Sequence, residues 1–370
     1  MNCRICASDH GTCFEVPYER LRHQDFTALG QGGVLHHCNS CGAIQNISRD
    51  LLKNGQESFS STDYSHSHQN CQTIKVAEFE QPLSRSFLQA EVLAKRLPST
   101  FQNVLDIGCF DGELLKEIQA RCPGKHYHGF DINPYLAESF PKDNGFKLYL
   151  GDFDKLQGPF DLITLSHSIM YFTELPQIIE TINSLLGDNG RVFIQTPNLD
   201  LNPCNILLAD QCWYFNKHNL QAMLAFFGMT VEFINADWFP REIMLTAKLS
   251  ADAVMDRDFL KDGQHQAVQT ALSYLMAMEN ELHNLSENNG RIYVLGTTVN
   301  AAFADGILQE KCCAFVDENN AKVGGRFRGK QVLHPKNLQR NDVVVLPYGH
   351  TIRRAAQRMT QEYHGDFFVV

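Results

Sequence analysis

The feature that most constrains the fold of this sequence is an alternation of strand-like and helical patterns between residues 101 and 250. The strand-like runs are NVLDIG, HYHGFDI, FKLYLGD, FDLITLSH, RVFIQTP, TVEFIN and EIMLTAKL. The helical patterns are GELLKEIQARC, ELPQIIETINSLLG and NLQAMLAFFG, and the last two close with glycine, the usual helix stop. Strands joined by crossover helices pair in parallel, so the sequence predicts a doubly wound α/β sheet that is covered on both faces.

The length of 370 residues favours more than one domain. Residues 1–75 show little periodicity and close with the polar stretch SFSSTDYSHSHQN. Residues 76–250 contain the alternation described above. Residues 251–370 begin with a long helical pattern and continue with a smaller α/β alternation. We therefore predict an N-terminal segment, a doubly wound domain and a second, Rossmann-like α/β domain.

The first strand leads into a glycine turn flanked by acids, VLDIGCFDG. Its candidate ligand-binding residues are Asp106, Gly108, Cys109, Asp111 and Gly112. A dinucleotide site needs G-x-G-x-x-G and a pyrophosphate on the next helix, whereas this turn has G-x-x-x-G between two acids. Acids at this place repel a pyrophosphate but suit a ligand with an ammonium group, such as S-adenosylmethionine.

Further candidate residues follow the next strand ends, where ligands bind in a doubly wound sheet. They are Asp131, Ile132, Asp152, Phe153, Ser166 and His167. Asp131 is placed to accept ribose hydroxyls, and Asp152 with Phe153 suits an adenine amino group and ring face. Any one of these acids alone also fits a helix cap. Their order along the chain is more specific than any single member.

This ordered series resembles the class I S-adenosylmethionine-dependent methyltransferases over about 150 residues. The resemblance implies a seven-stranded sheet whose last strand is antiparallel. The family usually has G-x-G in the first turn, and here Phe110 stands where the second glycine would be. That glycine is often replaced in the family.

Two cysteine pairs stand in the N-terminal segment, within MNCRICAS and HHCNSCGA. Cys3, Cys6, Cys38 and Cys41 together form the pattern of a closed, structural four-thiolate Zn²⁺ site. The alternatives are two unrelated pairs of thiols, a mixed site that uses His36 or His37, or a site that recruits Cys13 or Cys71. A structural metal would fold a loop-rich segment that lacks a large core of its own.

The three segments in this order resemble the three-part, zinc-containing sugar C-methyltransferases that act on nucleotide-linked keto-deoxysugars. The resemblance implies that the N-terminal segment folds over the active site and that the C-terminal unit helps to hold a sugar nucleotide. These enzymes carry a Glu-His pair whose histidine is the base. A gap-free alignment puts Asp210-Gln211 there, and glutamine accepts no proton at neutral pH. A shifted alignment puts Lys217-His218 there instead.

Methyl transfer is an in-line displacement in which the enzyme supplies orientation and, for a hydroxyl or carbon acid, a base. His167 is the leading candidate for the base, followed by His218 and Tyr214, with Tyr64 closing over the site. His167 also fits a helix cap or a pocket lining. Three functions remain open: a C- or O-methyltransferase acting on an activated sugar or glycan precursor, a methyltransferase with an unrelated small-molecule acceptor, and a protein that binds S-adenosylmethionine or a sugar nucleotide without turnover.

The C-terminal unit carries a glycine-rich, basic loop after a strand that ends at Asp317. Arg326, Arg328 and Lys330 in that loop fit either a phosphate or a solvated surface. Only Gly296 marks the preceding turn, where a nucleotide site usually has two or three glycines.

The net charge of the protein and its first residues indicate which partners and which location to expect. The formal net charge of −10 argues against broad nucleic-acid binding. No apolar run is long enough to cross a bilayer, and the start MNCRICASDHG lacks a signal-peptide pattern. We therefore expect a cytoplasmic protein with a small-molecule acceptor and no membrane partner. The oligomeric state does not follow from the sequence.

Overall fold

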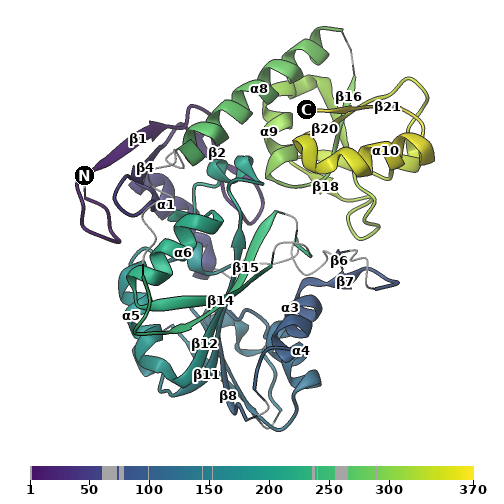
Figure 1. Ribbon diagram of the computed structural model, residues 1–370. Helices are drawn as coiled ribbons and strands as arrows, with labels where there is room; N and C mark the ends of the chain where they lie inside the picture. The colour runs from purple at the N-terminus through teal and green to yellow at the C-terminus, as the bar shows by residue number, and fades with distance from the viewer. Residues whose placement is uncertain are drawn as a thin grey trace.

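The computed structural model describes residues 2–60, 73–74, 79–98, 100–143, 145–151, 153–235, 238–239, 241–254, 266–288 and 291–370. Figure 1 shows a large sheet with helices on both sides, a smaller α/β unit above it, and the N-terminal segment lying against both. The predicted residues Tyr64, Cys71 and Asp152 lie outside the described residues.

The central sheet has seven strands in the order β10-β9-β8-β11-β12-β15-β14. Their bounds are β8 Asn103–Ile107, β9 His126–Asp131, β10 Phe146–Leu150, β11 Phe160–Ser166, β12 Leu186–Pro197, β14 Met229–Asn235 and β15 Glu242–Leu249. Strand β15 runs antiparallel to both of its neighbours, and the other printed pairings are parallel. The predicted seven-stranded sheet with an antiparallel last strand is confirmed.

Alternate residues of the central strands face opposite sides of the sheet, as the strand period of two requires. On β11, Leu162 packs in the core under α3 and α4, while Ile163 packs in the core under α5 and α6. Both residues are fully buried. The helices are α3 Arg85–Ala94, α4 Glu113–Arg121, α5 Leu175–Leu185 and α6 Lys217–Phe226. Burial on both faces explains why these strands are apolar throughout rather than alternating.

The two predicted glycine stops have different outcomes. Gly228 follows α6 with a φ of +77°, the left-handed conformation expected after a helix. The stop predicted for α5 is wrong, because α5 ends at Leu185 and β12 begins at the next residue. Leu186 pairs there with Phe160, so Gly187 lies inside the strand.

The N-terminal segment forms an antiparallel sheet in the order β1-β4-β5-β13, with a separate hairpin of β2 and β3. The bounds are β1 Gly11–Glu15, β2 Glu19–Leu21, β3 Ala28–Gln31, β4 Val34–Cys38, β5 Ile44–Asn46, α1 Arg49–Gln56, β6 Thr73–Ile74, β7 Leu83–Ser84 and β13 Trp213–Tyr214. Strand β13 comes from the central domain and pairs with β5. Ile5 and Leu52 share one apolar core with Leu220 of α6. The segment is therefore packed onto the central domain.

The residues after 266 form a second sheet in the order β18-β19-β17-β16-β20-β21. The bounds are α8 Ala267–Asn288, β16 Ile292–Leu295, α9 Val299–Leu308, β17 Cys312–Val316, β18 Arg326–Phe327, β19 Lys330–Leu333, β20 Val343–Leu346, α10 Arg353–Glu362 and β21 Asp366–Val369. All pairs except β18–β19 are parallel. The two middle strands, β16 with the sequence IYVL and β20 with VVVL, are buried at every residue.

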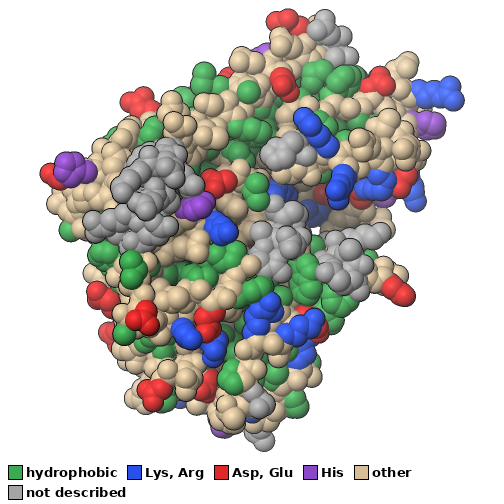
Figure 2. Space-filling view, in the orientation of Figure 1, with side chains coloured by type: hydrophobic (Ala, Val, Ile, Leu, Met, Phe, Trp, Pro, Cys, Tyr) green, Lys and Arg blue, Asp and Glu red, His purple; other side chains and the backbone are tan. Residues whose placement is uncertain are grey.

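Figure 2 shows acidic and basic side chains over the same face, with several Lys and Arg side chains gathered on the C-terminal unit. Within the described residues, no helix has the length and apolar character that a membrane crossing requires.

Candidate functional site

The glycine turn after β8 is built from residues in unusual backbone conformations. Gly108 and Gly112 have φ values of +81° and +74°, and Phe110 between them has +48°. A Cβ on Gly108 would lie 2.7 Å from Cβ of Ser168, so the position requires glycine for both conformation and space. The Phe110 N–H donates to Oδ2 of Asp131 at 3.0 Å, which ties the turn to the end of β9.

The acids predicted around the turn lie close to it and are mostly buried. Asp106 is 3% exposed, and its Oδ1 accepts a hydrogen bond of 2.6 Å from the Thr164 hydroxyl. Burial raises the pKa of Asp106 to about 7, and the neighbouring Asp131 adds to the shift while Thr164 opposes it. Burial also raises the pKa of Asp131, against the backbone N–H groups of Asn133 and Phe110. Two carboxyls that lack a cationic partner favour a positively charged ligand.

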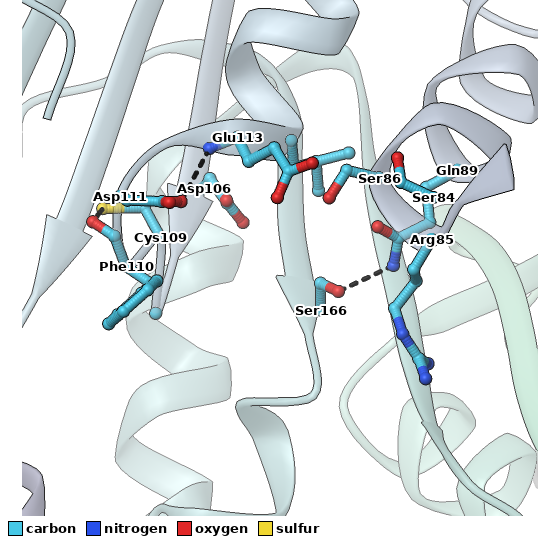
Figure 3. Close-up of a pocket in the computed structure, with 12 residues that line it drawn as sticks. Ser84, Arg85, Ser86, Gln89, Asp106, Cys109, Phe110, Asp111, Glu113 and Ser166 are labelled. Atoms are coloured by element: carbon cyan, nitrogen blue, oxygen red, sulfur yellow. Dashed lines mark hydrogen bonds between the residues drawn. The ribbon is translucent and has the colours of Figure 1, made fainter. Parts of the chain in front are cut away.

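Two hollows meet at this turn. The first, which we call the turn hollow, has a volume of about 60 Å³. It is lined by Ser84, Arg85, Ser86, Gln89, Asp106, Gly108, Cys109, Phe110, Asp111, Glu113, Leu114 and Ser166. Figure 3 shows the turn residues and the first residues of α3 converging on it from opposite sides. The N–H of Glu113 donates to Oδ1 of Asp111 at 3.2 Å, which fixes that carboxylate at the start of α4.

The second hollow, the histidine hollow, has a volume of about 290 Å³. It is lined by Gln56, Phe59, Gly108, Phe130, Asp131, Ile132, Ser166, His167, Ser168, Tyr171, Phe172 and Thr173. Gly108 and Ser166 line both hollows, so the two lie on either side of one turn. Phe153 packs edge-on against Phe130, with ring centroids 4.9 Å apart, and so supports this wall from behind. Ile132 is 48% exposed at the rim.

The predicted base, His167, follows β11 with a φ of +56° and lines the histidine hollow. Its Nε2 lies 3.0 Å from Oε2 of Glu242 at the start of β15. Arg85 of α3 reaches both His167 Nε2 and the same carboxylate oxygen. Arg85 can only donate, so its contact to Nε2 requires a lone pair on that nitrogen, whereas the contact to Glu242 requires Nε2–H, and one tautomer satisfies only one of the two. In the tautomer with Nε2–H, which Glu242 favours, the ring's lone pair is on Nδ1.

Two glutamines extend this contact into a continuous polar network. Gln195 of β12 donates to Oε2 of Glu242, and Gln89 of α3 donates to Oε1 of Gln195 at 2.8 Å. Gln89 also donates to the Ser166 hydroxyl at 2.6 Å. We call Arg85, Gln89, Ser166, His167, Gln195 and Glu242 the Glu242 network. It joins the two hollows through side chains that fix one another's direction.

The electrostatics of the Glu242 network keep the histidine neutral and the glutamate charged. Burial lowers the pKa of His167; Glu242 opposes that shift, and Arg85 adds to it. Burial alone would raise the pKa of Glu242, but Arg85 and His167 outweigh it and hold that pKa well below its usual value. A neutral imidazole with an oriented ring is the form that accepts a proton.

The sequence analysis did not predict four members of the Glu242 network, which are Arg85, Gln89, Gln195 and Glu242. The available signal was weak: Gln195 interrupts the apolar run RVFIQTP of a strand buried on both faces, where a polar residue needs a partner. Arg85 and Glu242 are 157 residues apart, and no local pattern links them.

Two predicted catalytic residues lie away from the histidine hollow, which corrects the sequence interpretation. Tyr214 is 1% exposed on β13, where its hydroxyl donates to the Leu208 carbonyl at 2.6 Å and accepts from Arg20. His218 lies in the first turn of α6 and borders other hollows, beside Asp200 and Gln221. Local alignment around WYFNKHN could not reveal that Trp213 and Tyr214 join the N-terminal sheet.

Both alignments of the family's Glu-His pair therefore fail to place a base in the histidine hollow. Gln211 is fully buried and exchanges amide hydrogen bonds with Asn205. Asp210 is also fully buried, and its Oδ2 accepts from the His23 N–H at 2.8 Å. These side chains support the loop before β13.

The four cysteines of the two pairs come together in the N-terminal segment. The sulfur atoms of Cys3, Cys6, Cys38 and Cys41 all lie within 4.8 Å of one another. The Cys3–Cys41 and Cys6–Cys38 sulfurs are 3.6 and 3.5 Å apart. Tetrahedral Zn²⁺ with bonds of about 2.3 Å separates its sulfurs by about 3.8 Å, so this cluster fits a zinc ion.

The alternative ligands lie outside this cluster. Among the described residues, the four cysteines are the group of potential ligands that comes together, and neither His36 nor His37 belongs to it. Nδ1 of His36 is instead 3.0 Å from the Gln45 amide. Cys13 is exposed on β1.

The basic loop of the C-terminal unit contacts its own carboxylates, which corrects the phosphate-binding interpretation. Arg328 donates to Asp305 and Glu19, each at 2.8 Å, and Lys330 pairs with Asp305. These contacts attach the loop to α9 and to the N-terminal hairpin. Arg326 bonds the Gly329 carbonyl of its own turn.

Comparison with known proteins points to one family. A model of the methyltransferase domain matches residues 34–234 of the 370. Malonyl-[acyl-carrier protein] O-methyltransferase of Magnetococcus marinus is 31% identical over 100 residues, which are 25% of this chain and 37% of that protein. Trans-aconitate 2-methyltransferase of Escherichia coli is 26% identical over 136 residues, which are 36% of this chain and 54% of that protein. The chain thus spans about half or less of these curated relatives.

Among solved structures, similarity is confined to part of the chain. The mitomycin 7-O-methyltransferase has a TM-score of 0.40 and 17% identity, covering 45% of this chain and 55% of that one. An S-adenosylmethionine-dependent methyltransferase of Mesorhizobium loti has a TM-score of 0.36 and 16% identity, covering 42% of this chain and 95% of that one.

Proposed function

The chain belongs to the methyltransferase domain family, and on that premise we propose that it transfers the methyl group of S-adenosylmethionine to a small-molecule acceptor. One observation carries the proposal: the buried carboxyl of Asp106 and the half-buried carboxyls of Asp111 and Asp131 surround a glycine turn at the carboxyl ends of parallel strands. That edge is where doubly wound sheets bind ligands. The cofactor supplies an electrophilic methyl on a sulfonium, and the residues of the chain bind, orient and deprotonate.

The cofactor would be held by the residues around the turn. Asp106 and Asp111 face the turn hollow and suit an ammonium group, while Asp131 faces the histidine hollow and suits ribose hydroxyls. Gly108 and Cys109 allow close backbone approach, Gly112 precedes α4, and Ser166 lies between the hollows. Ile132 and Phe153 belong to the proposed nucleoside side.

His167 is the proposed general base of the transfer. In the tautomer whose Nε2–H donates to Glu242, a proton from an acceptor hydroxyl or carbon acid would pass to Nδ1. The Glu242 carboxylate favours the imidazolium once it forms, whereas burial and the charge of Arg85 disfavour it and keep the ring neutral before the transfer. This arrangement follows the logic in which a buried carboxylate orients a catalytic imidazole.

The preferred acceptor class is a nucleotide-activated sugar or glycan precursor, with methylation at carbon or oxygen. The support is the resemblance of the three-part chain to sugar C-methyltransferases. A carboxylate acceptor is the second candidate. Its support is that the names of the two curated relatives give malonyl-[acyl-carrier protein] and trans-aconitate as their acceptors.

We also propose that the four cysteines hold a structural Zn²⁺. Three of the four are buried, and an all-thiolate set leaves no open position for chemistry. The ion would stabilise the fold of the segment that brings Gln56 and Phe59 to the histidine hollow.

Calorimetry with S-adenosylhomocysteine, followed by methylation of an acceptor panel, tests the function. We expect micromolar binding that weakens at least tenfold in Asp131→Ala, because the ribose loses its carboxylate. Asp161→Ala is the matched control, since Asp161 caps the backbone at residues 102–103 away from both hollows. Absence of heat with the wild type would refute the cofactor. Binding without methylation of nucleotide sugars, carboxylic acids or other small molecules would identify a non-catalytic binding protein.

A further inference from the structure

A third hollow opens beside the histidine hollow, and three of its four charged lining residues are basic. It has a volume of about 430 Å³. Arg4, Arg49 and Lys53 bring three positive charges to it, against the one carboxylate of Glu174. The other lining residues are Asn46, Ile47, Leu52, Gln56 and Thr173. We call it the basic hollow.

Arg4 is fixed in this wall by neutral partners. Its Nη1 donates to the Thr173 carbonyl at 3.0 Å, and its Nε donates to Oε1 of Gln45 at 3.2 Å. Its guanidinium carbon lies 4.5 Å from the centroid of the Trp213 ring. These contacts set the direction of the guanidinium without neutralising its charge. Arg4 is therefore a preorganised cation, while Arg49 and Lys53 are exposed on α1 and can adjust.

The positive charge of the basic hollow is not balanced within the described residues. None of the ion pairs found there within 4.0 Å involves Arg4, Arg49 or Lys53. The C-terminal loop differs, because Arg328 and Lys330 are paired with carboxylates of this chain. An anionic ligand would thus find uncompensated cations on the N-terminal segment.

The basic hollow adjoins the histidine hollow. Gln56 and Thr173 line both. Gln56 donates to the Tyr171 carbonyl at 2.9 Å, which fixes the end of α1 against the wall that His167 also lines. A ligand with a compact reactive part and an anionic extension would have a place for each.

We propose that the basic hollow binds the anionic group of the acceptor, a diphosphate or a polycarboxylate, while the atom to be methylated lies in the histidine hollow. This inference rests on the proposed function. Three cations and one carboxylate give a net charge of +2, which matches a ligand group with two or more negative charges. Guanidinium groups bind phosphate and carboxylate through paired hydrogen bonds, and the partly buried setting of Arg4 strengthens the attraction.

The test is calorimetry of the full chain with inorganic pyrophosphate and with citrate, at low ionic strength. The variant Arg49→Ala/Lys53→Ala removes two exposed cations and leaves the packed Arg4 in place. The control Arg340→Ala/Arg354→Ala removes two exposed cations from the C-terminal unit. We expect the first variant to bind the anion at least tenfold more weakly than the wild type, and the control to stay within twofold.

The outcomes separate the two anion sources and the two proposals. Tighter binding of pyrophosphate supports a diphosphate acceptor, and tighter binding of citrate supports a polycarboxylate. The inference is overturned if the wild type binds neither anion, or if Arg49→Ala/Lys53→Ala binds like the control. S-adenosylhomocysteine binding is measured on the same samples and should stay within twofold in both variants. A wild type that does not bind the cofactor would contradict the proposed function, whereas a wild type that binds the cofactor but neither anion contradicts only this inference.

Discussion

Replacing Glu242 by glutamine tests whether the Glu242 network is an electrostatic unit. The substitution keeps the side-chain volume and removes the carboxylate that Arg85 contacts. Arg85 and Glu242 are only 13% and 17% exposed, so the remaining cation cannot be fully hydrated. Breaking a buried pair from one side typically costs 3–5 kcal/mol, and the residual exposure places our expectation at about 3 kcal/mol.

Urea unfolding at pH 7.5 measures this loss. The double variant Glu242→Gln/Arg85→Met removes the cation together with the carboxylate and should recover about 2 kcal/mol of the free energy of unfolding. Glu232→Gln is the matched control, because Glu232 pairs with Arg191 and Lys248 at the surface, and exposed pairs contribute about 1 kcal/mol or less.

The loss of stability in Glu242→Gln should become smaller at acidic pH. The folded-state pKa of Glu242 lies well below its ordinary value of 4.5, so its stabilising effect is complete above that pH and declines as pH falls through the folded pKa. The difference between the wild type and Glu242→Gln should therefore be constant from pH 8 to pH 5 and shrink below that. An equal loss in Glu242→Gln and Glu232→Gln, or no recovery in the double variant, would refute the reasoning.

Three further predictions concern the turn, its acid and the cysteine cluster. Gly108→Ala should lower the free energy of unfolding by about 1–3 kcal/mol more than Gly124→Ala. Both glycines have positive φ, but only at Gly108 does a neighbour, Ser168, occupy the space of a Cβ. Equal urea midpoints for the two variants would contradict this. Asp106 has a pKa of about 7 and should release a proton when the ammonium group of the cofactor binds beside it. Because the buffer takes up that proton, the heat of binding at pH 7 should differ between phosphate and Tris. Equal heats in the two buffers would contradict this prediction. For the wild type we expect elemental analysis to find about one zinc per chain. Cys41→Ser should lose this metal and melt about 5 °C or more lower, whereas Cys13→Ser should keep it. Metal-free, folded wild type would refute the zinc site.

The central sheet was predictable because its signals are local. Apolar runs such as FDLITLSH and the helical patterns between them are set by burial on both faces, as the opposite packing of Leu162 and Ile163 illustrates. The glycine turn was recognisable for the same reason, because the left-handed backbone conformation of Gly108 favours glycine whatever the rest of the fold.

The partners of the candidate base were not predictable, because they depend on tertiary contacts. Arg85 and Glu242 reach His167 from α3 and from the antiparallel strand β15, and neither belongs to a recognisable motif. Tyr214 and His218 lie away from the histidine hollow for a related reason. A short motif gave no sign that β13 pairs with β5 rather than with the central sheet.

A crystal structure of the protein with S-adenosylhomocysteine is the most direct test of the central claim, that carboxyls around the glycine turn select a cationic nucleoside. The account predicts the ribose against Asp131 and the amino group on the Asp106 side of Gly108. A dinucleotide or a sugar nucleotide with its phosphates at that turn would contradict it.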